Sequence, residues 1–446
     1  MANSKKPTPS NLLRFFQQRL TALNPAGRPL TVALSGGMDS VVLFDLLLQQ
    51  RQTMGFDLSA VHINHQISPN AANWAAFCTA LCQQHQIPIQ VKKVQVARRA
   101  KQGLEAAART ARYQAFAEID ADVLLLAHHL DDQAETQLHH LLRGTGVRGA
   151  AGMDALRNSP YTLARPLIEV PRSVLLGYAE QRQLRWVEDE SNADTRLTRN
   201  FLRHHVLPQI EQRFPAYRQT LARAAQHFSE ADALLDELAT LDAVHAVQAE
   251  KLNLRELSKL SPARARNLMR AYLNAQGITQ LDTECLQEWL RQLLTARSDS
   301  RVQLGVAGFV LRRYRQQAWL ELSTPLPAPD WLWPWQGESE IKLPALGGCV
   351  SFIETTANGI ALDKLQHTKI TLRLRQGGEK FQPDCNRPRK TLKHLLQNAA
   401  IPPWQRERLP LLFCGDELVA VPGIGIDCAY QSRPGEAALK INWIRF

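Results

Sequence analysis

The chain has 446 residues, of which 45% are hydrophobic, and its formal net charge is +11. This length is enough for about two to four domains with packed cores. No run in the sequence reaches the roughly 18 apolar residues of a helix that crosses a membrane, so we expect no membrane-spanning helix.

The seven cysteines show no Cys-x-x-Cys spacing. Their odd number, together with a polar N-terminus that lacks the apolar core of a secretory leader, predicts free thiols in a reducing cytoplasm. Cys78 and Cys82 are four residues apart, about one helical turn. We expect them to be neighbours in a core rather than metal ligands.

The first half of the chain alternates short apolar runs with segments of helical periodicity. We expect four strand-and-helix pairs, at 30–34 and 39–50, 58–63 and 70–85, 89–94 and 104–119, and 123–127 and 131–142. This alternation predicts an α/β domain built on a doubly wound parallel sheet. Ligands of such sheets bind beyond the carboxyl ends of the strands, where Ser35, His62 and His128 fall. The sequence therefore predicts one shared site at this edge.

The second half of the chain lacks this regular alternation of strands and helices. Helical periodicity predominates from residue 217 to about 295, strand-like alternation follows over 301–322, and a proline-rich linker covers 323–330. We therefore predict an α/β domain, a mainly helical middle domain and a small mixed α/β domain, over residues 1–215, 216–325 and 326–446.

The turn after the first strand has the sequence Ser35-Gly36-Gly37-Met38-Asp39-Ser40 and leads directly into an apolar helix. Glycines allow the backbone to approach a ligand closely, and the positive end of the helix attracts phosphate. The serine hydroxyls add donors. The alternative is an ordinary tight turn in which Asp39 caps the helix. The strand before the turn and the helix after it favour the phosphate site.

A second cluster, Ala127-His-His-Leu-Asp-Asp-Gln-Ala-Glu-Thr136, follows the fourth strand. Asp132 and Glu135 are three residues apart and share a helix face. Taken alone, this spacing resembles a capping box. Beside a phosphate site, however, carboxylates and imidazoles can bind Mg²⁺ or deprotonate an amine. We therefore expect Asp39, Asp132 and Glu135 to act together.

Arg109 and Arg112 lie on the predicted helix 104–119. They could be aimed at a phosphate or at an activated base. The alternative for Arg109 is a surface ion pair with Glu105, which would contribute only a few tenths of a kcal/mol. The residues alone leave the two interpretations equal.

The positive charge is concentrated in the second half of the chain. Residues 251–320 contain 12 Lys and Arg against 5 Asp and Glu, and residues 364–410 contain 11 against 3. Basic regions away from the phosphate loop indicate a polyanion larger than a nucleotide, which favours nucleic acid over an ordinary solvated surface.

The three motifs occur in the order and spacing of the tRNA(Ile)-lysidine synthetases, which belong to the N-type ATP pyrophosphatase (PP-loop) superfamily. The third motif in this comparison is Glu105-Ala-Ala-Ala-Arg-Thr-Ala-Arg-Tyr113. Further stretches that resemble the family are 188–194, Arg199-Asn-Phe-Leu-Arg203, Arg387-Pro-Arg-Lys-Thr-Leu-Lys-His-Leu-Leu396 and 401–412. The resemblance covers nearly the whole chain.

The resemblance implies an ATP-dependent ligase with Mg²⁺ as a cofactor. In that family ATP adenylylates C2 of the wobble cytidine in an isoleucine tRNA with a CAU anticodon, and pyrophosphate leaves. The amine of L-lysine then displaces AMP and forms lysidine. The modified tRNA reads AUA and accepts isoleucine. The sequence leaves the oligomeric state open, a homodimer included.

The family pattern assigns roles to residues of this chain. Catalytic roles fall to Asp39, Asp132, Glu135, Arg109 and Arg112, and metal binding falls to Asp39 and Asp132. ATP contacts fall to Ser35, Gly36, Gly37, Met38, Asp39, Ser40, His62 and His128. We expect the tRNA phosphates to contact Arg387, Arg389, Lys390 and Lys393. Which carboxylate binds metal and which accepts the amine proton stays open.

Two other functions compete with this one. A tRNA cytidine thiolase of the same superfamily commonly uses Cys-x-x-Cys pairs, which this chain lacks. A non-catalytic RNA-binding protein on an old enzyme scaffold has no need for both the phosphate loop and the acidic cluster. A measurement of ATP conversion to AMP would distinguish the enzyme from the non-catalytic RNA-binding protein.

Overall fold

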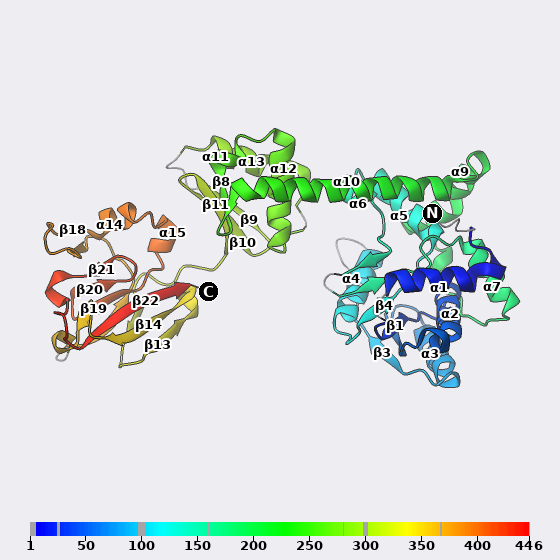
Figure 1. The fold of residues 1–446 in the computed structure, drawn as a ribbon, viewed down its shortest axis with the longest axis horizontal. Coiled ribbons are helices and arrows are strands. Elements are labelled where there is room, and N and C mark those ends of the chain that lie inside the picture. Colours follow the sequence, from blue (N-terminus) through cyan, green and yellow to red (C-terminus); the bar gives the residue numbers. More distant parts are fainter. Residues whose placement is uncertain are drawn as a thin grey trace. The chain divides into compact units, whose positions relative to one another are not determined.

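A computed structural model describes residues 6–24, 27–96, 104–158, 161–279, 281–297, 302–365 and 368–445 (Figure 1). The chain forms two compact units, Met1–Glu237 and Leu238–Phe446. The three-domain division over 1–215, 216–325 and 326–446 stays a prediction. No helix among the described ranges is long and apolar enough to pass through a lipid bilayer.

The first unit is built on a six-stranded sheet with the order β3-β2-β1-β4-β6-β5. All neighbours pair in parallel except β5 and β6 at one edge. The strands are β1 (Leu30–Ala33), β2 (Leu58–Asn64), β3 (Ile89–Lys93), β4 (Val123–Leu125), β5 (Leu156–Arg157) and β6 (Leu163–Ala164). The parallel α/β sheet predicted from the alternating pattern is confirmed.

Helices cover both faces of this sheet because successive strand residues point to opposite sides. On one face Val61 and Leu124 pack with Phe116 of α4. The helices and short turns up to residue 193 are η1 (Pro9–Asn11), α1 (Leu12–Leu23), α2 (Met38–Met54), α3 (Ala71–Gln84), α4 (Leu104–Ala117), α5 (Leu130–Leu142), α6 (Val147–Ala150), α7 (Arg172–Gln181) and η2 (Glu190–Ala193). The sheet is therefore wound on both sides.

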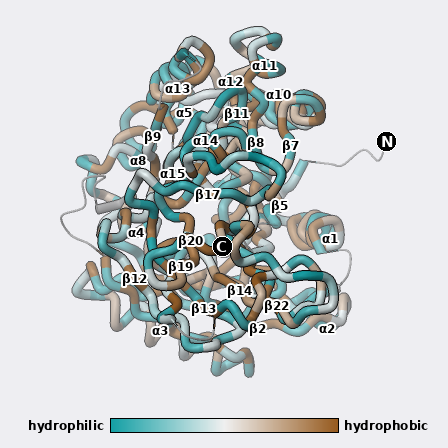
Figure 2. Tube along the Cα trace, turned by 90° about the vertical axis from the view of Figure 1, so that its left-hand side faces the viewer, coloured by the Kyte–Doolittle hydropathy of each residue, from teal (hydrophilic) through white to brown (hydrophobic). Residues whose placement is uncertain are grey.

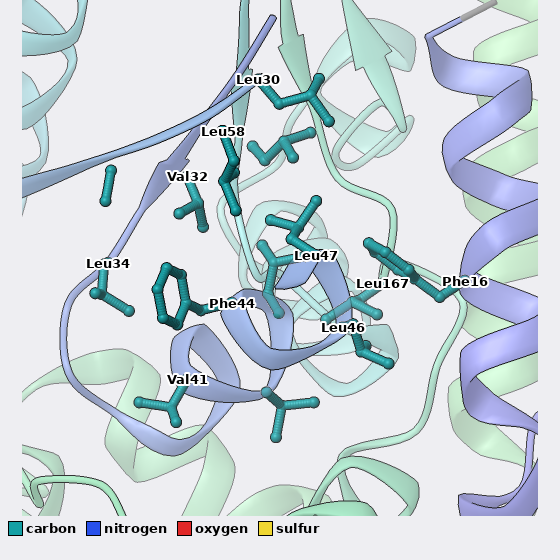
Figure 3. Packing of buried hydrophobic residues seen from close by; sticks show 14 of the residues in the cluster. Phe16, Leu30, Val32, Leu34, Val41, Phe44, Leu46, Leu47, Leu58 and Leu167 are labelled. Carbon is teal, nitrogen blue, oxygen red and sulfur yellow. The ribbon is translucent and has the colours of Figure 1, made fainter. Parts of the chain in front are cut away.

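The opposite face holds the largest core of the first unit, shown in Figure 3. Leu30, Val32 and Leu34 of the β1 segment point toward Phe44 and its neighbours on α2. Helix α2 is apolar on nearly all sides, which is why it packs between the sheet and further helices. This packing fixes the position of the turn that joins β1 to α2.

Four helical segments complete the first unit. They are α8 (Thr198–Phe201), the π-helical turn η3 (Leu202–Val206), α9 (Leu207–Arg213) and α10 (Tyr217–Ala246). Helix α10 continues past Glu237 into the second unit. π-Helical turns are rare and occur mostly at functional sites, so η3 marks a segment to inspect.

The second unit begins with a helical layer on a small antiparallel sheet of order β7-β8-β11-β10-β9. Helices α12 and α13 are amphipathic, and hydrophilic and hydrophobic residues alternate along α13 in Figure 2. The elements are β7 (Val247–Gln248), β8 (Lys251–Asn253), α11 (Leu254–Leu257), α12 (Pro262–Ala275), α13 (Thr283–Thr295), β9 (Gln303–Val306), β10 (Phe309–Tyr314) and β11 (Gln317–Leu322). The predicted helices and the strand-like alternation are both present.

The rest of the second unit contains two larger sheets and one short hairpin. The sheet orders are β12-β16-β19-β20-β21 and β13-β14-β22-β15. The elements are β12 (Leu332–Pro334), β13 (Glu340–Leu343), η4 (Pro344–Leu346), β14 (Gly348–Thr355), β15 (Ile360–Ala361), η5 (Leu362–Leu365), β16 (Ile370–Arg373), β17 (Lys380–Phe381), β18 (Lys390–Thr391), α14 (Leu392–Asn398), α15 (Pro403–Arg406), β19 (Leu411–Cys414), β20 (Glu417–Val421), β21 (Gly425–Ile426), η6 (Cys428–Tyr430) and β22 (Ala438–Arg445). We call residues 380–391, which form β17, β18 and their connection, the basic hairpin.

Candidate active site

The turn between β1 and α2 is held by hydrogen bonds to its two serines. The Ser40 hydroxyl accepts from the Gly36 amide at 3.2 Å and donates to the Gly37 carbonyl at 2.8 Å. The Ser35 hydroxyl donates to Ser40 Oγ at 3.0 Å. Both serines therefore shape the turn, and direct donation from their hydroxyls to a phosphate stays a prediction.

Both the backbone conformation and the close neighbours of residue 36 require a glycine at this position. Its φ of +91° lies in the left-handed region, and a Cβ there would lie 2.9 Å from Val187 Cγ2. The Val187 amide donates to the Gly36 carbonyl at 3.0 Å. The segment after α7 thus closes the turn from one side. Gly37 then caps α2, so that Met38 and Asp39 open the helix with its positive end at the turn.

His62 supports the same turn from the neighbouring strand. Its Nδ1 lies 2.8 Å from the Leu34 carbonyl, and the ring is buried. Burial lowers the pKa of His62 although the Leu34 contact acts in the opposite direction. His62 therefore positions the end of β1, and a direct contact with ATP stays a prediction.

His128 follows β4 and faces a group of arginines. Its Nδ1 accepts a hydrogen bond from Arg165 Nε at 3.0 Å. Burial and the charges of Arg165, Arg109 and Arg112 hold the pKa of His128 well below its ordinary value, so the ring is neutral. A neutral imidazole can accept from a guanidinium without adding charge to a site for phosphates.

Arg112 makes a similar contact with a second imidazole, since its Nε lies 3.4 Å from His65 Nε2. Burial and the nearby Arg112 lower the pKa of His65 to about 4. Arg109 lies with its guanidinium 5.1 Å from the centre of the Tyr113 ring. Arg109, Arg112 and Arg165 are therefore gathered around His128, as an anion site requires. The Glu105 side chain, the alternative partner of Arg109, lies outside the described residues.

His129, the next residue, is directed at carboxylates instead. Its Nε2 lies 3.6 Å from Asp39 Oδ2 and 3.4 Å from Asp132 Oδ2. Burial opposes a charge on this ring, but Asp132, Asp39 and Asp131 overcome it and raise the pKa of His129 to about 9. The ring is therefore a cation at neutral pH, and it links the phosphate turn to helix α5.

The capping alternative for Asp132 is also realised. Asp132 Oδ2 accepts from the His129 amide at 3.0 Å, and the Asp132 amide lies 3.3 Å from His129 Nδ1. A hydrogen bond from this amide needs an unprotonated Nδ1 and therefore a neutral ring, whereas Asp131 Oδ2, 3.9 Å from the same Nδ1, favours the imidazolium by its charge. Asp132 thus starts the helix and contacts the imidazolium.

Glu135 is bound by an arginine that the sequence did not single out for catalysis. Arg203 Nε and Nη2 donate to its two carboxylate oxygens at 2.6 and 2.7 Å. Burial raises the pKa of Glu135 although the Arg203 pair lowers it. Arg203 also lies 3.5 Å from Asp132 Oδ1. It belongs to the π-helical turn η3 and to the motif 199–203, and that motif was the only signal for it.

Asp131 anchors α5 to other elements. Its Oδ1 accepts from Arg218 Nε of α10 at 2.5 Å, and its Oδ2 accepts from the Arg172 amide at 2.8 Å. Arg218 in turn pairs with Glu211. The N-terminus of α10 is therefore tied to the helix that carries Asp132 and Glu135.

The donor set suits one hard cation. Asp39 Oδ1 is buried and has no hydrogen-bond partner. An unpaired carboxylate oxygen of this kind fits Mg²⁺, which usually takes one or two carboxylates together with phosphate oxygens and water. No group of three His, Cys, Asp or Glu with the arrangement of a metal site occurs in the described part of the chain. Asp132 is engaged by His129 and Arg203, so its role as a metal ligand stays a prediction.

In the second unit the four predicted tRNA contacts lie on or beside the basic hairpin. Arg387 and Lys393 are exposed and Lys390 is half-buried. Arg387 pairs with Asp384 at 3.1 Å. Arg389 Nη2 donates at 3.0 Å to the buried Asp427. Arg389 is thus partly structural, while Arg387 and Lys393 present their charge to solvent.

The expectation that all cysteines are free thiols is wrong for two of them. Cys385 of the basic hairpin and Cys428 of η6 form a disulfide with a Cα–Cα distance of 5.5 Å. They are 43 residues apart in the sequence, and the folding of the chain brings their segments together. The spacing of the cysteines therefore could not reveal the pair. Cys78 and Cys82 are free and lie in the core, as predicted.

Comparisons with known proteins agree with this arrangement. Residues 10–210 match the PP-loop domain family, residues 252–319 the TilS substrate binding domain and residues 370–443 the TilS substrate C-terminal domain. The tRNA(Ile)-lysidine synthase of Nitrosomonas europaea is 46% identical over 99% of this chain and 98% of its own length. The chain belongs to the tRNA(Ile)-lysidine synthase family. It is therefore an enzyme with an ATP-using PP-loop domain.

Further members of the lysidine synthase family are comparably similar. The tRNA(Ile)-lysidine synthase of Aromatoleum aromaticum is 41% identical, over 93% of this chain and 97% of its own length. Among solved structures, the U34-tRNA thiolase NcsA from Methanococcus maripaludis has 18% identity and a TM-score of 0.41, and it covers 49% of this chain and 79% of its own. The full-length relatives, not this structure, identify the family.

Proposed function

We propose that the protein ligates L-lysine to C2 of the wobble cytidine in an isoleucine tRNA with a CAU anticodon. ATP first adenylylates the C2 oxygen and releases pyrophosphate. The ε-amine of lysine then attacks C2 and expels AMP, which carries away the oxygen. The observation that carries the proposal is the junction between Asp39 of the phosphate turn and the His129–Asp132 pair, in a chain of this family.

The first half-reaction uses the turn and the arginines. Negative charge builds on the leaving pyrophosphate, and the positive end of α2 together with Arg109 and Arg112 stabilises it. His128 and His65 stay neutral, so they hold Arg165 and Arg112 in place without competing for phosphate. Asp39 Oδ1 would hold Mg²⁺, which supplies charge neutralisation on the phosphates when bound.

The second half-reaction uses the acidic cluster. A lysine amine has a reference pKa of roughly 10.4, so it must lose a proton before it attacks. The acidic cluster attracts the ammonium and also offers a base. Glu135 is the best candidate for the base because its pKa is raised, whereas the pKa of Asp39 is lowered by His129, Arg172 and Arg203 despite burial. Arg203 would release or share Glu135 at that step.

The anticodon loop presents its wobble base without the opening of a duplex. A methionine tRNA can have the same CAU anticodon, so the anticodon alone cannot select the substrate. The basic regions 251–320 and 364–410 of the second unit can contact other parts of the tRNA through phosphates. Arg387, Arg389, Lys390 and Lys393 are the contacts that we propose.

The test is pyrophosphate release from ATP by the full-length protein with Mg²⁺, on unmodified isoleucine tRNA with a CAU anticodon and on elongator methionine tRNA. We expect release with the isoleucine tRNA only, and radiolabelled lysine should become bound to it. Release without lysine incorporation would retain adenylylation and reject lysine as the nucleophile. No release with either tRNA would reject the proposed reaction.

A further inference from the structure

The Cys385–Cys428 disulfide joins η6 to the basic hairpin, which carries three of the four proposed tRNA contacts. Cys385 is exposed and stands two residues before Arg387. Disulfides inside cells are uncommon, and those that occur are usually transient and redox-sensing. We propose that Cys385 and Cys428 form a reversible thiol–disulfide site that sets how firmly the basic hairpin is held for tRNA. This inference rests on the proposed function of the hairpin.

The two cysteines are held together by contacts that do not depend on the bond. The Gln382 amide donates to Asp427 Oδ2 at 3.0 Å, and the Cys428 amide donates to the Gln382 carbonyl at 2.9 Å. Gln431 Nε2 donates to the Pro383 carbonyl at 2.9 Å. These hydrogen bonds hold the first residues after β17 next to η6. The reduced thiols therefore stay close enough to pair again.

The tip of the hairpin is attached differently. Asp384 bonds mainly to its own neighbours, with the Arg387 amide at 3.1 Å and the Asn386 amide at 3.0 Å. The disulfide fastens this tip to η6 directly through Cys385. Reduction would release the tip while Arg389, through the buried Asp427, keeps the base of the hairpin in place. Gln382 Nε2 also donates to the Arg387 carbonyl at 2.8 Å, so the disulfide adds a second attachment to the segment around Arg387.

The exposure of Cys385, beside a half-buried Cys428, favours exchange with a small disulfide such as oxidised glutathione. The exposed Cys385 thiolate attacks one glutathione sulfur, and one reduced glutathione leaves. Cys428 then attacks the mixed disulfide and expels the second glutathione. Two protein thiols are oxidised, one glutathione disulfide is reduced to two thiols, and the two protons pass to the leaving thiolates.

The other close cysteine pair shows the opposite chemistry. Cys78 and Cys82 are both buried and unbonded. Burial raises the pKa of Cys78 to about 12 and the pKa of Cys82 to about 11, so neither forms the reactive thiolate at neutral pH. The chain thus contains one inert pair in the core of the first unit and one accessible pair at the basic hairpin.

The experiment compares the full-length protein after treatment with excess dithiothreitol and after equilibration with oxidised glutathione. Alkylation followed by peptide mass spectrometry measures the fraction of Cys385 bonded to Cys428. Binding of unmodified isoleucine tRNA is measured in both states. We expect Kd to be about 3- to 10-fold lower in the oxidised state, because a held tip loses less freedom on binding. The C385S variant should bind like the reduced protein in both buffers.

Three results would overturn the inference. The first is the absence of a Cys385–Cys428 bond at any glutathione ratio. The second is bond formation with equal Kd in both states, and the third is the same redox effect in C385S. Loss of tRNA binding in both states, with the bond still formed, would reject the proposed hairpin contacts as well. A C285S control, which removes a cysteine outside this site, should retain the full redox effect.

Discussion

The two units of the molecule use charge in opposite ways. Around His129 the charges are buried or half-buried and contact one another, and each carboxylate has a named partner within about 4 Å. On the basic hairpin and directly after it, Arg387 and Lys393 are exposed to solvent. Buried networks of this kind have one geometry and serve chemistry, whereas exposed cations attract a polyanion at longer range.

This difference predicts how each region fails. Removal of one group from the network around His129 leaves its partner charges unpaired. The loss of activity should therefore be large and should differ from one residue to the next. Removal of an exposed cation should weaken tRNA binding by a similar factor at each position and should be sensitive to salt. The following substitutions test that contrast.

The largest effect is expected for Asp39→Asn. The amide keeps the shape of the side chain but removes the charge that pairs with His129 and that would hold Mg²⁺. Pyrophosphate release should fall roughly 10²–10³-fold. The matched control is Asp57→Asn, an exposed position of the first unit, which should retain wild-type release. Wild-type turnover in D39N would remove Asp39 from the proposed mechanism.

Arg203→Lys should have the next largest effect. Lysine keeps the positive charge but cannot make the two-pronged bond to Glu135. Lysine incorporation into tRNA should fall by roughly 10–100-fold, with ATP binding retained. Arg196→Lys alters an exposed ion pair of the same unit and should have no effect. Equal losses of lysine incorporation in both variants would reject a specific role for the Arg203–Glu135 bond.

Charge reversal on the basic hairpin and at the neighbouring Lys393 should give a moderate loss of tRNA affinity. The double variant R387E/K393E should raise the Kd for tRNA about 10-fold or more and reduce the salt dependence of binding by about two phosphate contacts. ATP binding should be unchanged. Arg433→Glu, an exposed reversal in the same unit but outside the hairpin, serves as the control. An unchanged tRNA affinity in the double variant would reject the proposed contacts.

The smallest effect concerns stability and pH. Because the folded pKa of His129, about 9, is above the ordinary 6.5, its charge stabilises the fold fully below pH 6.5. This contribution, on the order of 3 kcal/mol, is lost as the pH rises through about 9. The thermal midpoint should therefore drop between pH 6.5 and 9.5, and His129→Gln should lessen the drop. An identical drop in the variant would place the titration elsewhere.

The sequence predicted the fold well because periodicity determines it. Strands that alternate with helices led to the parallel sheet, and the rule for strand ends placed the β1 turn and the β4 cluster at one edge. The rule could not tell His128 from His129, which face arginines and carboxylates respectively. Adjacent residues at the start of a helix point in different directions, and only the packed structure decides which is which.

Arg203 and Cys428 show the other limit of prediction. Arg203 reaches Glu135 from a segment 68 residues further along the chain. Cys428 pairs with a cysteine 43 residues away. Neither spacing has a local signature, because both contacts arise from how segments fold back on one another. The family motif around 199–203 drew attention to Arg203, but nothing in the sequence indicated its partner.

The backbone bond from Val187 to Gly36 has a consequence for synthesis of the protein. The nucleotide turn is encoded near the N-terminus, yet its final brace is made only after all six strands and most helices of the first unit have been translated. A nascent chain that ends before Val187 can form β1 and α2 but lacks this brace. The turn between β1 and α2 can therefore reach its final form only late in synthesis. By then α5, which carries Asp132 and Glu135, has already been made and can pack beside it.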